Sequence, residues 1–168
     1  MRKNTKFLVH SATIAALYML LTYLQNTLFP DSASQAIQFR MSEALCVLAL
    51  VTPAAIPGLT VGCMLFNLCY PALPWDFLIG SAATLLATGT MYLTRSLRIK
   101  RFPLLGLTLP ALFNGLLVGW ELAWVIGGGF WFNAACVAIG ELAVLFIPGT
   151  ILYYTILNRK LLKLFELN

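Results

Sequence analysis

Charged side chains are scarce in this sequence. Asp, Glu, Lys and Arg together make up 10% of the 168 residues, whereas hydrophobic residues make up 60%. A soluble globular domain usually contains about 25% charged residues. The composition therefore excludes an ordinary soluble domain and predicts a multi-pass integral protein of the cell membrane.

The sequence also lacks the motifs of several kinds of chemistry. A single histidine excludes a metal site built from several histidines, and there is no H-E-x-x-H motif. There is no G-x-x-x-x-G-K-[ST] phosphate-binding loop and no G-x-S-x-G nucleophile motif. The four cysteines show no C-x-x-C spacing, so no disulfide framework is predicted. We expect no metal, no cofactor, no catalytic residue and no ATP hydrolysis by this chain alone.

Long apolar runs recur along the whole chain. Several approach the roughly 20 residues that an α-helix needs to cross a hydrocarbon core of about 30 Å. We predict an all-α membrane protein with six transmembrane helices in a single domain over residues 1–168. The second run is short because Pro53 interrupts it, and a re-entrant pair is the alternative there. The predicted spans are approximately residues 7–29, 41–53, 55–72, 77–94, 103–126 and 132–157.

Basic residues gather in three clusters at the ends of these runs. The net charge is +5, but basic residues so divided do not form the extended patch expected for nucleic-acid binding. The positive-inside rule instead places all three clusters, and with them both ends of the chain, in the cytoplasm. The clusters are Arg2, Lys3 and Lys6; Arg95, Arg98, Lys100 and Arg101; and Arg159, Lys160 and Lys163.

Asn114 and Glu121 place an amide and a carboxylate inside the fifth apolar run. Seven residues at about 100° per residue return to nearly the same azimuth, so both side chains should face the same neighbour. An ionised carboxylate near the bilayer centre costs at least about 2.5 kcal/mol and normally faces a partner, a ligand or a cavity. Glu141 lies in the last run and Glu43 at the start of the second. These side chains indicate a polar pocket inside the membrane.

Two residues outside the fifth run have both a structural and a ligand-binding interpretation. Arg40 stands three residues before Glu43 at a helix entrance, where the two form an interfacial ion pair or face a ligand. Asn67 makes an interhelical hydrogen bond or donates to the ligand.

Three residues beside predicted turns also have two interpretations. Trp75 belongs either to the aromatic belt at the membrane surface or to the pocket wall. Asn133 caps the last helix or joins the pocket, and Asp76 is predicted to cap the fourth helix.

Small residues in the first run form two pairs with a spacing of four, Ser11 with Ala15 and Ala12 with Ala16. Such spacing lets the backbone of another helix approach closely. The neighbour is either another helix of this chain or a helix of a partner protein.

Several of these features resemble a known family. Ala12-x-x-x-Ala16 resembles the signature by which substrate-binding S components of energy-coupling factor (ECF) transporters dock on their shared transmembrane partner. An ordered set of further motifs is more specific and looks like the pattern of the QueT family of queuosine-precursor transporters, over about residues 8 to 158. The motifs are Gln38-Phe39-Arg40-x-x-Glu43-Ala44-Leu45, Pro57-Gly58-Leu59-x-x-Gly62-Cys63, Pro110-x-x-x-Asn114 and Gly140-Glu141.

The resemblance implies an S-component-like bundle that binds 7-aminomethyl-7-deazaguanine or a close relative without converting it. It also implies a complex with a transmembrane coupling subunit and two ATPase subunits. The guanine-like edge of such a ligand carries two donors that one carboxylate, Glu121 or Glu141, can accept together. The ring carbonyl requires a donor such as Asn114, Asn67 or Arg40. The aminomethyl cation requires a second carboxylate or an aromatic face.

Two other functions are compatible with intramembrane carboxylates. A proton-coupled exporter would use a membrane glutamate and depend on a proton gradient. A carboxylate-based membrane enzyme would convert its ligand in purified form. An S component would bind its ligand tightly without conversion and would need ATP only together with its partners.

Overall fold

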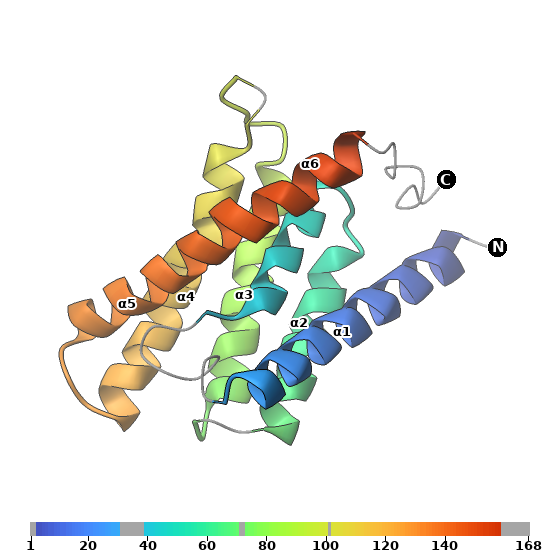
Figure 1. Ribbon diagram of the computed structural model, residues 1–168. Helices are drawn as coiled ribbons and strands as arrows, with labels where there is room; N and C mark the ends of the chain where they lie inside the picture. Colours follow the sequence, from blue (N-terminus) through green and yellow to red (C-terminus); the bar gives the residue numbers. More distant parts are fainter. Residues whose placement is uncertain (1–2, 31–38, 71–72, 101, 159–168) are drawn as a thin grey trace.

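The computed structural model describes residues 3–30, 39–70, 73–100 and 102–158, and every element within these ranges is helical (Figure 1). This confirms the predicted helical class. In chain order the elements are α1 (Lys3–Leu28), the 3₁₀ helix η1 (Met41–Leu50), α2 (Ala55–Cys69), α3 (Asp76–Leu93), α4 (Leu104–Val125), α5 (Phe130–Val144), the π-helical segment η2 (Leu145–Gly149) and α6 (Thr150–Asn158).

The helices agree in position with the predicted apolar runs. In the described part of the chain, three are long and apolar enough to cross a membrane: Lys3–Leu28, Leu104–Val125 and the continuous segment Phe130–Asn158. The last segment changes to π-helical geometry around Pro148, which lacks the N–H that a regular helix requires at that position. The structure therefore supports a helical membrane protein, whereas six crossings and cytoplasmic chain ends remain predictions.

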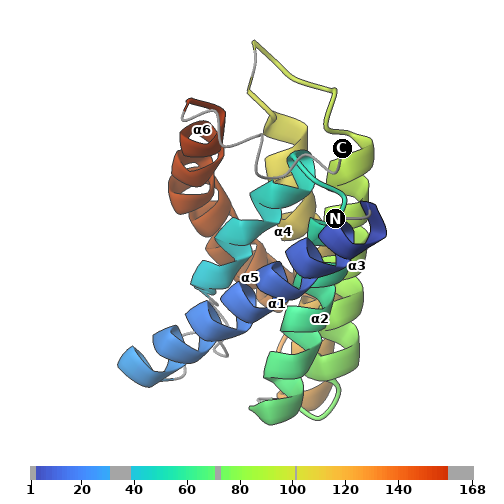
Figure 2. The same cartoon turned by 90° about the vertical axis from the view of Figure 1, so that its right-hand side faces the viewer.

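The turns between helices lie at two opposite ends of the bundle. In Figures 1 and 2 the α3–α4 turn lies at the upper end, and the α2–α3 turn lies at the lower end. Figure 1 shows the end of α6 toward the upper end as well. Arg95 and Arg98 belong to the α3–α4 turn. Five basic residues of the predicted clusters lie outside the described residues, at positions 2, 101, 159, 160 and 163.

The second predicted span is a 3₁₀ helix rather than an α-helix. Every residue from Ser42 to Leu50 in η1 is buried, and η1 contacts each of the other helical elements. Figure 1 shows this segment (cyan) crossing the middle of the bundle. A 3₁₀ helix rises about 2.0 Å per residue, so these ten residues extend further than ten α-helical residues would. Burial on all sides and hydrogen bonds from α1 hold this uncommonly long 3₁₀ segment in place.

The first and second helices pack through small residues. A Cβ atom added to Gly58 would lie 2.7 Å from the Ser11 carbonyl oxygen, and one added to Gly62 would lie 2.9 Å from the Ala15 carbonyl oxygen. Ser11 and Ala15 are accordingly buried. This pair of small residues therefore serves packing within the chain, which leaves Ala12 and Ala16 on an exposed side of α1.

Gly62→Ala should destabilise the protein. The added methyl group would meet the Ala15 carbonyl and the Tyr18 Cβ, each at 2.9 Å, and overpacking of this kind costs about 1–3 kcal/mol. Gly89→Ala is the matched control, because nothing lies within 4 Å of its added Cβ. We expect the thermal unfolding midpoint in detergent to fall for Gly62→Ala and to stay or rise for Gly89→Ala. Equal midpoints for the two variants would contradict the close approach of α1 and α2.

Candidate functional site

The polar side chains that the sequence placed in apolar runs, and with them Asp76, are buried in the interior of the bundle. They come from η1 and from helices α2 to α5, which are far apart in the chain. Less than a tenth of each of these residues is exposed: Glu43, Asn67, Asp76, Asn114, Glu121 and Glu141.

Arg40 is bound on the α2–α3 side of this interior. Its Nη2 donates to Asn67 Oδ1 at 2.8 Å and lies 3.9 Å from Asp76 Oδ2. Asn67 Nδ2 in turn donates to the Asp76 backbone carbonyl at 3.1 Å. The guanidinium carbon lies 5.6 Å from the centre of the Phe66 ring. Arg40 therefore forms its ion pair with Asp76, and not with Glu43.

The prediction that Asp76 caps a helix is wrong. Trp75 occupies the N-cap position of α3 and no side chain bonds to the first turn. Asp76 is the first residue of the helix, and its carboxylate instead faces Arg40. A hydrogen bond or ion pair with the charged guanidinium of Arg40 is stronger than one with a neutral backbone N–H of the first helical turn. The Asp76 carboxylate therefore faces Arg40 instead of capping the helix.

Glu43 is held between α1 and its own helix. The Tyr18 hydroxyl donates to Glu43 Oε1, and the Cys46 thiol lies 3.1 Å from Glu43 Oε2 as a donor. Sequence analysis missed Tyr18. Two features of the sequence pointed to it. Tyr18 places a phenol in the middle of an apolar run, four residues before the hydroxyl of Thr22. It also lies on the side of the helix that carries the small residues Ser11 and Ala15.

Asn114 and Glu141 join α4 to α5. Asn114 Nδ2 donates to Glu141 Oε1 at 2.6 Å. The two helices approach closely at Gly119, where an added Cβ atom would lie 2.6 Å from the Ala134 Cα atom. This close packing brings the amide of one helix within reach of the carboxylate of the other.

Asn114 and Glu121 both point inward, as their spacing predicted, but they have different surroundings. Asn114 binds Glu141, whereas Glu121 lies near the charge of Asp76 on α3. Glu121 is fully buried, and no side chain among the described residues donates to its carboxylate; the group that interacts with it by hydrogen bonding is the backbone N–H of Trp75. Desolvating a carboxylate that has no cationic partner costs several kcal/mol. A group kept under such conditions is typical of a binding site.

Within this polar region, Glu141 Oε2 and Arg40 Nε lack a hydrogen-bond partner in the described part of the chain. Glu141 also interacts electrostatically with Glu43 and with Arg40. The interior thus contains four carboxyl groups. Those of Glu43, Asp76 and Glu141 interact with the guanidinium of Arg40, and that of Glu121 interacts with Asp76. Like charges held so close disfavour full ionisation, and a cation placed among them relieves the repulsion. The arrangement favours a ligand that is positively charged and rich in hydrogen-bond donors.

Trp75 and Asn133 lie at the edge of this region. The Trp75 side chain is 46% exposed, so its part in a pocket wall remains a prediction. Asn133 does not cap a helix, because α5 begins three residues earlier at Phe130. Its Nδ2 instead donates to the Gly127 carbonyl at 3.1 Å, which closes the turn between α4 and α5.

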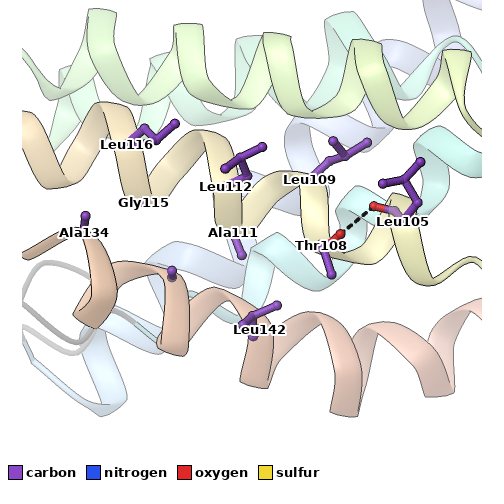
Figure 3. Close-up of a pocket in the computed structure, with 10 residues that line it drawn as sticks. Leu105, Thr108, Leu109, Ala111, Leu112, Gly115, Leu116, Ala134 and Leu142 are labelled. Carbon is purple, nitrogen blue, oxygen red and sulfur yellow. Dashed lines mark hydrogen bonds between the residues drawn. The ribbon is translucent and has the colours of Figure 1, made fainter. Parts of the chain in front are cut away.

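A separate apolar pocket of about 430 Å³ lies between α4 and α5 (Figure 3). None of the predicted ligand-binding residues lines it. Such a wall offers almost no partner for a guanine-like edge, so we do not place the ligand there. Among its lining residues are Leu105, Leu109, Leu112, Leu116, Ala138 and Leu142.

Comparison with known proteins gave one result. The family model described as QueT transporter matches residues 8–158, which is most of the chain and includes all of the polar residues described above. No curated protein and no solved structure matches the chain.

Proposed function

The chain belongs to the QueT transporter family, and from this premise we propose that it is the substrate-binding S component of an ECF-type importer. The proposed cargo is 7-aminomethyl-7-deazaguanine or a close relative. Membership of a transporter family makes this chain a membrane transporter component. The observation that supports the cargo best is the set of buried carboxylates in the interior, among them Glu121, whose carboxylate accepts from no side chain in the described residues.

The free atoms of the site suggest how the ligand is held. No side chain in the described residues donates to the Glu121 oxygens, and the lone pairs left beside the Trp75 backbone bond can accept the ring N–H and the amino group of the guanine-like edge as a pair. Arg40 Nε is an available donor and suits the ring carbonyl. Glu141 Oε2, close to the charge of Glu43, suits the aminomethyl cation. Asn114 keeps Glu141 oriented, and Asn67 keeps Arg40 oriented.

Glu121→Gln and Glu141→Gln should each weaken binding of 7-aminomethyl-7-deazaguanine about ten- to a hundredfold, the effect of losing a buried charge-assisted hydrogen bond. Glutamine keeps the size of the side chain but replaces one acceptor oxygen by a donor. Equilibrium binding to the purified chain measures the effect, with thermal stability recorded in parallel. Ser81→Ala is the control, since within the described ranges the buried Ser81 hydroxyl bonds to the Phe77 carbonyl of its own helix. If both glutamine variants bind like the parent, the ligand does not lie between α3, α4 and α5.

Proton-coupled transport is the second candidate function. Buried carboxylates that accept from no side chain of the described residues, such as Glu121, also carry protons in membrane pumps. The two functions differ in their energy source. In proteoliposomes that contain the chain, its coupling subunit and two ATPases, the importer requires ATP and continues when the proton gradient is collapsed. Uptake or export by the chain alone, driven by a proton gradient, would overturn the proposed function. Chemical conversion of the ligand by the purified chain would overturn it in favour of an enzyme.

A further inference from the structure

Tyr18 connects the outermost helix of the proposed site to a carboxylate inside it. The side chain is fully buried, and its hydroxyl donates to Glu43 Oε1. We propose that Tyr18 is a positioning residue for the ligand: its hydroxyl fixes the Glu43 carboxylate at the end of the site that receives the ligand's cation. This inference rests on the proposed function.

The Glu43 carboxylate is fixed at both of its oxygens. Tyr18 donates to Oε1, and the Cys46 thiol donates to Oε2. An ionised carboxylate has about four acceptor positions, so these two donors set its orientation and leave a lone pair on each oxygen. Because the charges of Glu43 and Glu141 interact, fixing Glu43 holds a second carboxylate in the neighbourhood of Glu141. A primary ammonium group suits that region, since it donates three hydrogen bonds.

Tyr18 belongs to a series of contacts that bind α1 to the start of η1. One turn further along α1, Thr22 Oγ1 donates to Ser42 Oγ at 2.7 Å. Another turn on, Gln25 Oε1 accepts the Met41 backbone N–H at 2.7 Å. These polar side chains follow the i, i+4, i+7 spacing of one helix face. A shift of α1 along its axis would therefore move the Glu43 carboxylate.

The opposite side of α1 carries the exposed residues Ala12 and Ala16. The same helix thus contacts the inner carboxylate through Tyr18 and offers a small-residue surface outward. The position of Tyr18 makes the placement of α1 a determinant of ligand affinity.

A purely structural role for the tyrosine ring is the competing interpretation, and the chain offers a matched control. Tyr153 is 1% exposed and belongs to the same apolar core as Tyr18. Its hydroxyl, however, has no hydrogen-bond partner among the described residues. Phenylalanine at either position keeps the ring and removes only the hydroxyl. Only at Tyr18 does that hydroxyl orient a carboxylate.

The test measures equilibrium binding of 7-aminomethyl-7-deazaguanine to purified parent, Tyr18→Phe and Tyr153→Phe, with the thermal midpoint of each. We expect Tyr18→Phe to weaken binding about tenfold or more, because a hydrogen bond to a charged group is lost. Tyr153→Phe should bind like the parent. Adding Glu43→Gln to Tyr18→Phe should cost much less than the two single effects combined, because Tyr18 acts through Glu43.

Each outcome decides a different question. If the parent binds the ligand and Tyr18→Phe binds it with equal affinity, the positioning role is overturned and the proposed function stays intact. Fully additive effects in the double variant, or equal losses for Tyr18→Phe and Tyr153→Phe, assign Tyr18 to core packing only and also overturn it. A well-folded parent that binds no deazaguanine overturns the proposed function, and the role of Tyr18 with it.

Discussion

Ala16→Trp should abolish ATP-driven uptake of 7-aminomethyl-7-deazaguanine by the assembled complex, while the purified chain keeps its affinity for the ligand. Ala16 lies on the exposed side of α1, one turn from the exposed Ala12. A partner helix that packs on these small side chains needs its backbone within close reach of α1, and an indole group prevents that approach. Ala12→Trp should have the same effect. The measurements are uptake into proteoliposomes and equilibrium binding to each purified variant.

Two control variants distinguish blocked docking from a general effect of a tryptophan on this chain. Leu85→Trp places the same side chain on α3, at a residue that is 47% exposed, and should leave both uptake and binding at the parental level. Ala15→Trp places it on the buried side of α1, where the Ala15 backbone already meets Gly62, and should prevent folding. If Ala16→Trp loses ligand binding or folds poorly, the exposed small residues serve this chain itself and the proposed docking surface is wrong.

The inward direction of the polar residues could be predicted from the sequence. The seven-residue spacing of Asn114 and Glu121 in a helix, and the cost of exposing a carboxylate to hydrocarbon, both require that these side chains face the interior. The structure buries both of them. The cost of exposing a carboxylate also predicted that Glu141 faces inward, and it is buried. For Asn67 the structure shows an interhelical hydrogen bond, one of its two predicted roles.

The pairing of these residues could not be predicted, because it depends on how helices distant in sequence are placed. Arg40 has Glu43 three residues away, yet its ion pair is with Asp76. Tyr18 contacts Glu43 because η1, a 3₁₀ helix, packs beside α1. Hydrophobic periodicity does not separate a fully buried 3₁₀ segment from a short α-helix, since both read as a continuous apolar run.

The two pairs of small residues in α1 also show that spacing does not reveal which helix is the neighbour. Spacing alone predicts close helix approach for Ser11 with Ala15 and for Ala12 with Ala16. The structure assigns the first pair to packing against α2, and it leaves the second pair exposed. One residue of difference in register thus separates an internal contact from a surface that remains available to a partner.

Selectivity for guanine-like ligands is expected to be large. Adenine presents a ring-nitrogen acceptor where a 7-deazaguanine presents the N–H that a carboxylate accepts, so Glu121 would face a lone pair and remain without a full set of partners. Sites whose buried polar groups are left unpaired by the wrong ligand can reject it by a factor on the order of 10⁴. Competition of adenine against 7-aminomethyl-7-deazaguanine on the purified chain measures this factor.

The control is Glu121→Gln, whose amide can donate to the adenine nitrogen. The preference for the deazaguanine should therefore shrink in this variant, whereas the unrelated Ser81→Ala should keep it. Equal affinity of the parent chain for adenine and the deazaguanine would rule out the proposed cargo, and an unchanged preference in Glu121→Gln would place the guanine-like edge on another carboxylate.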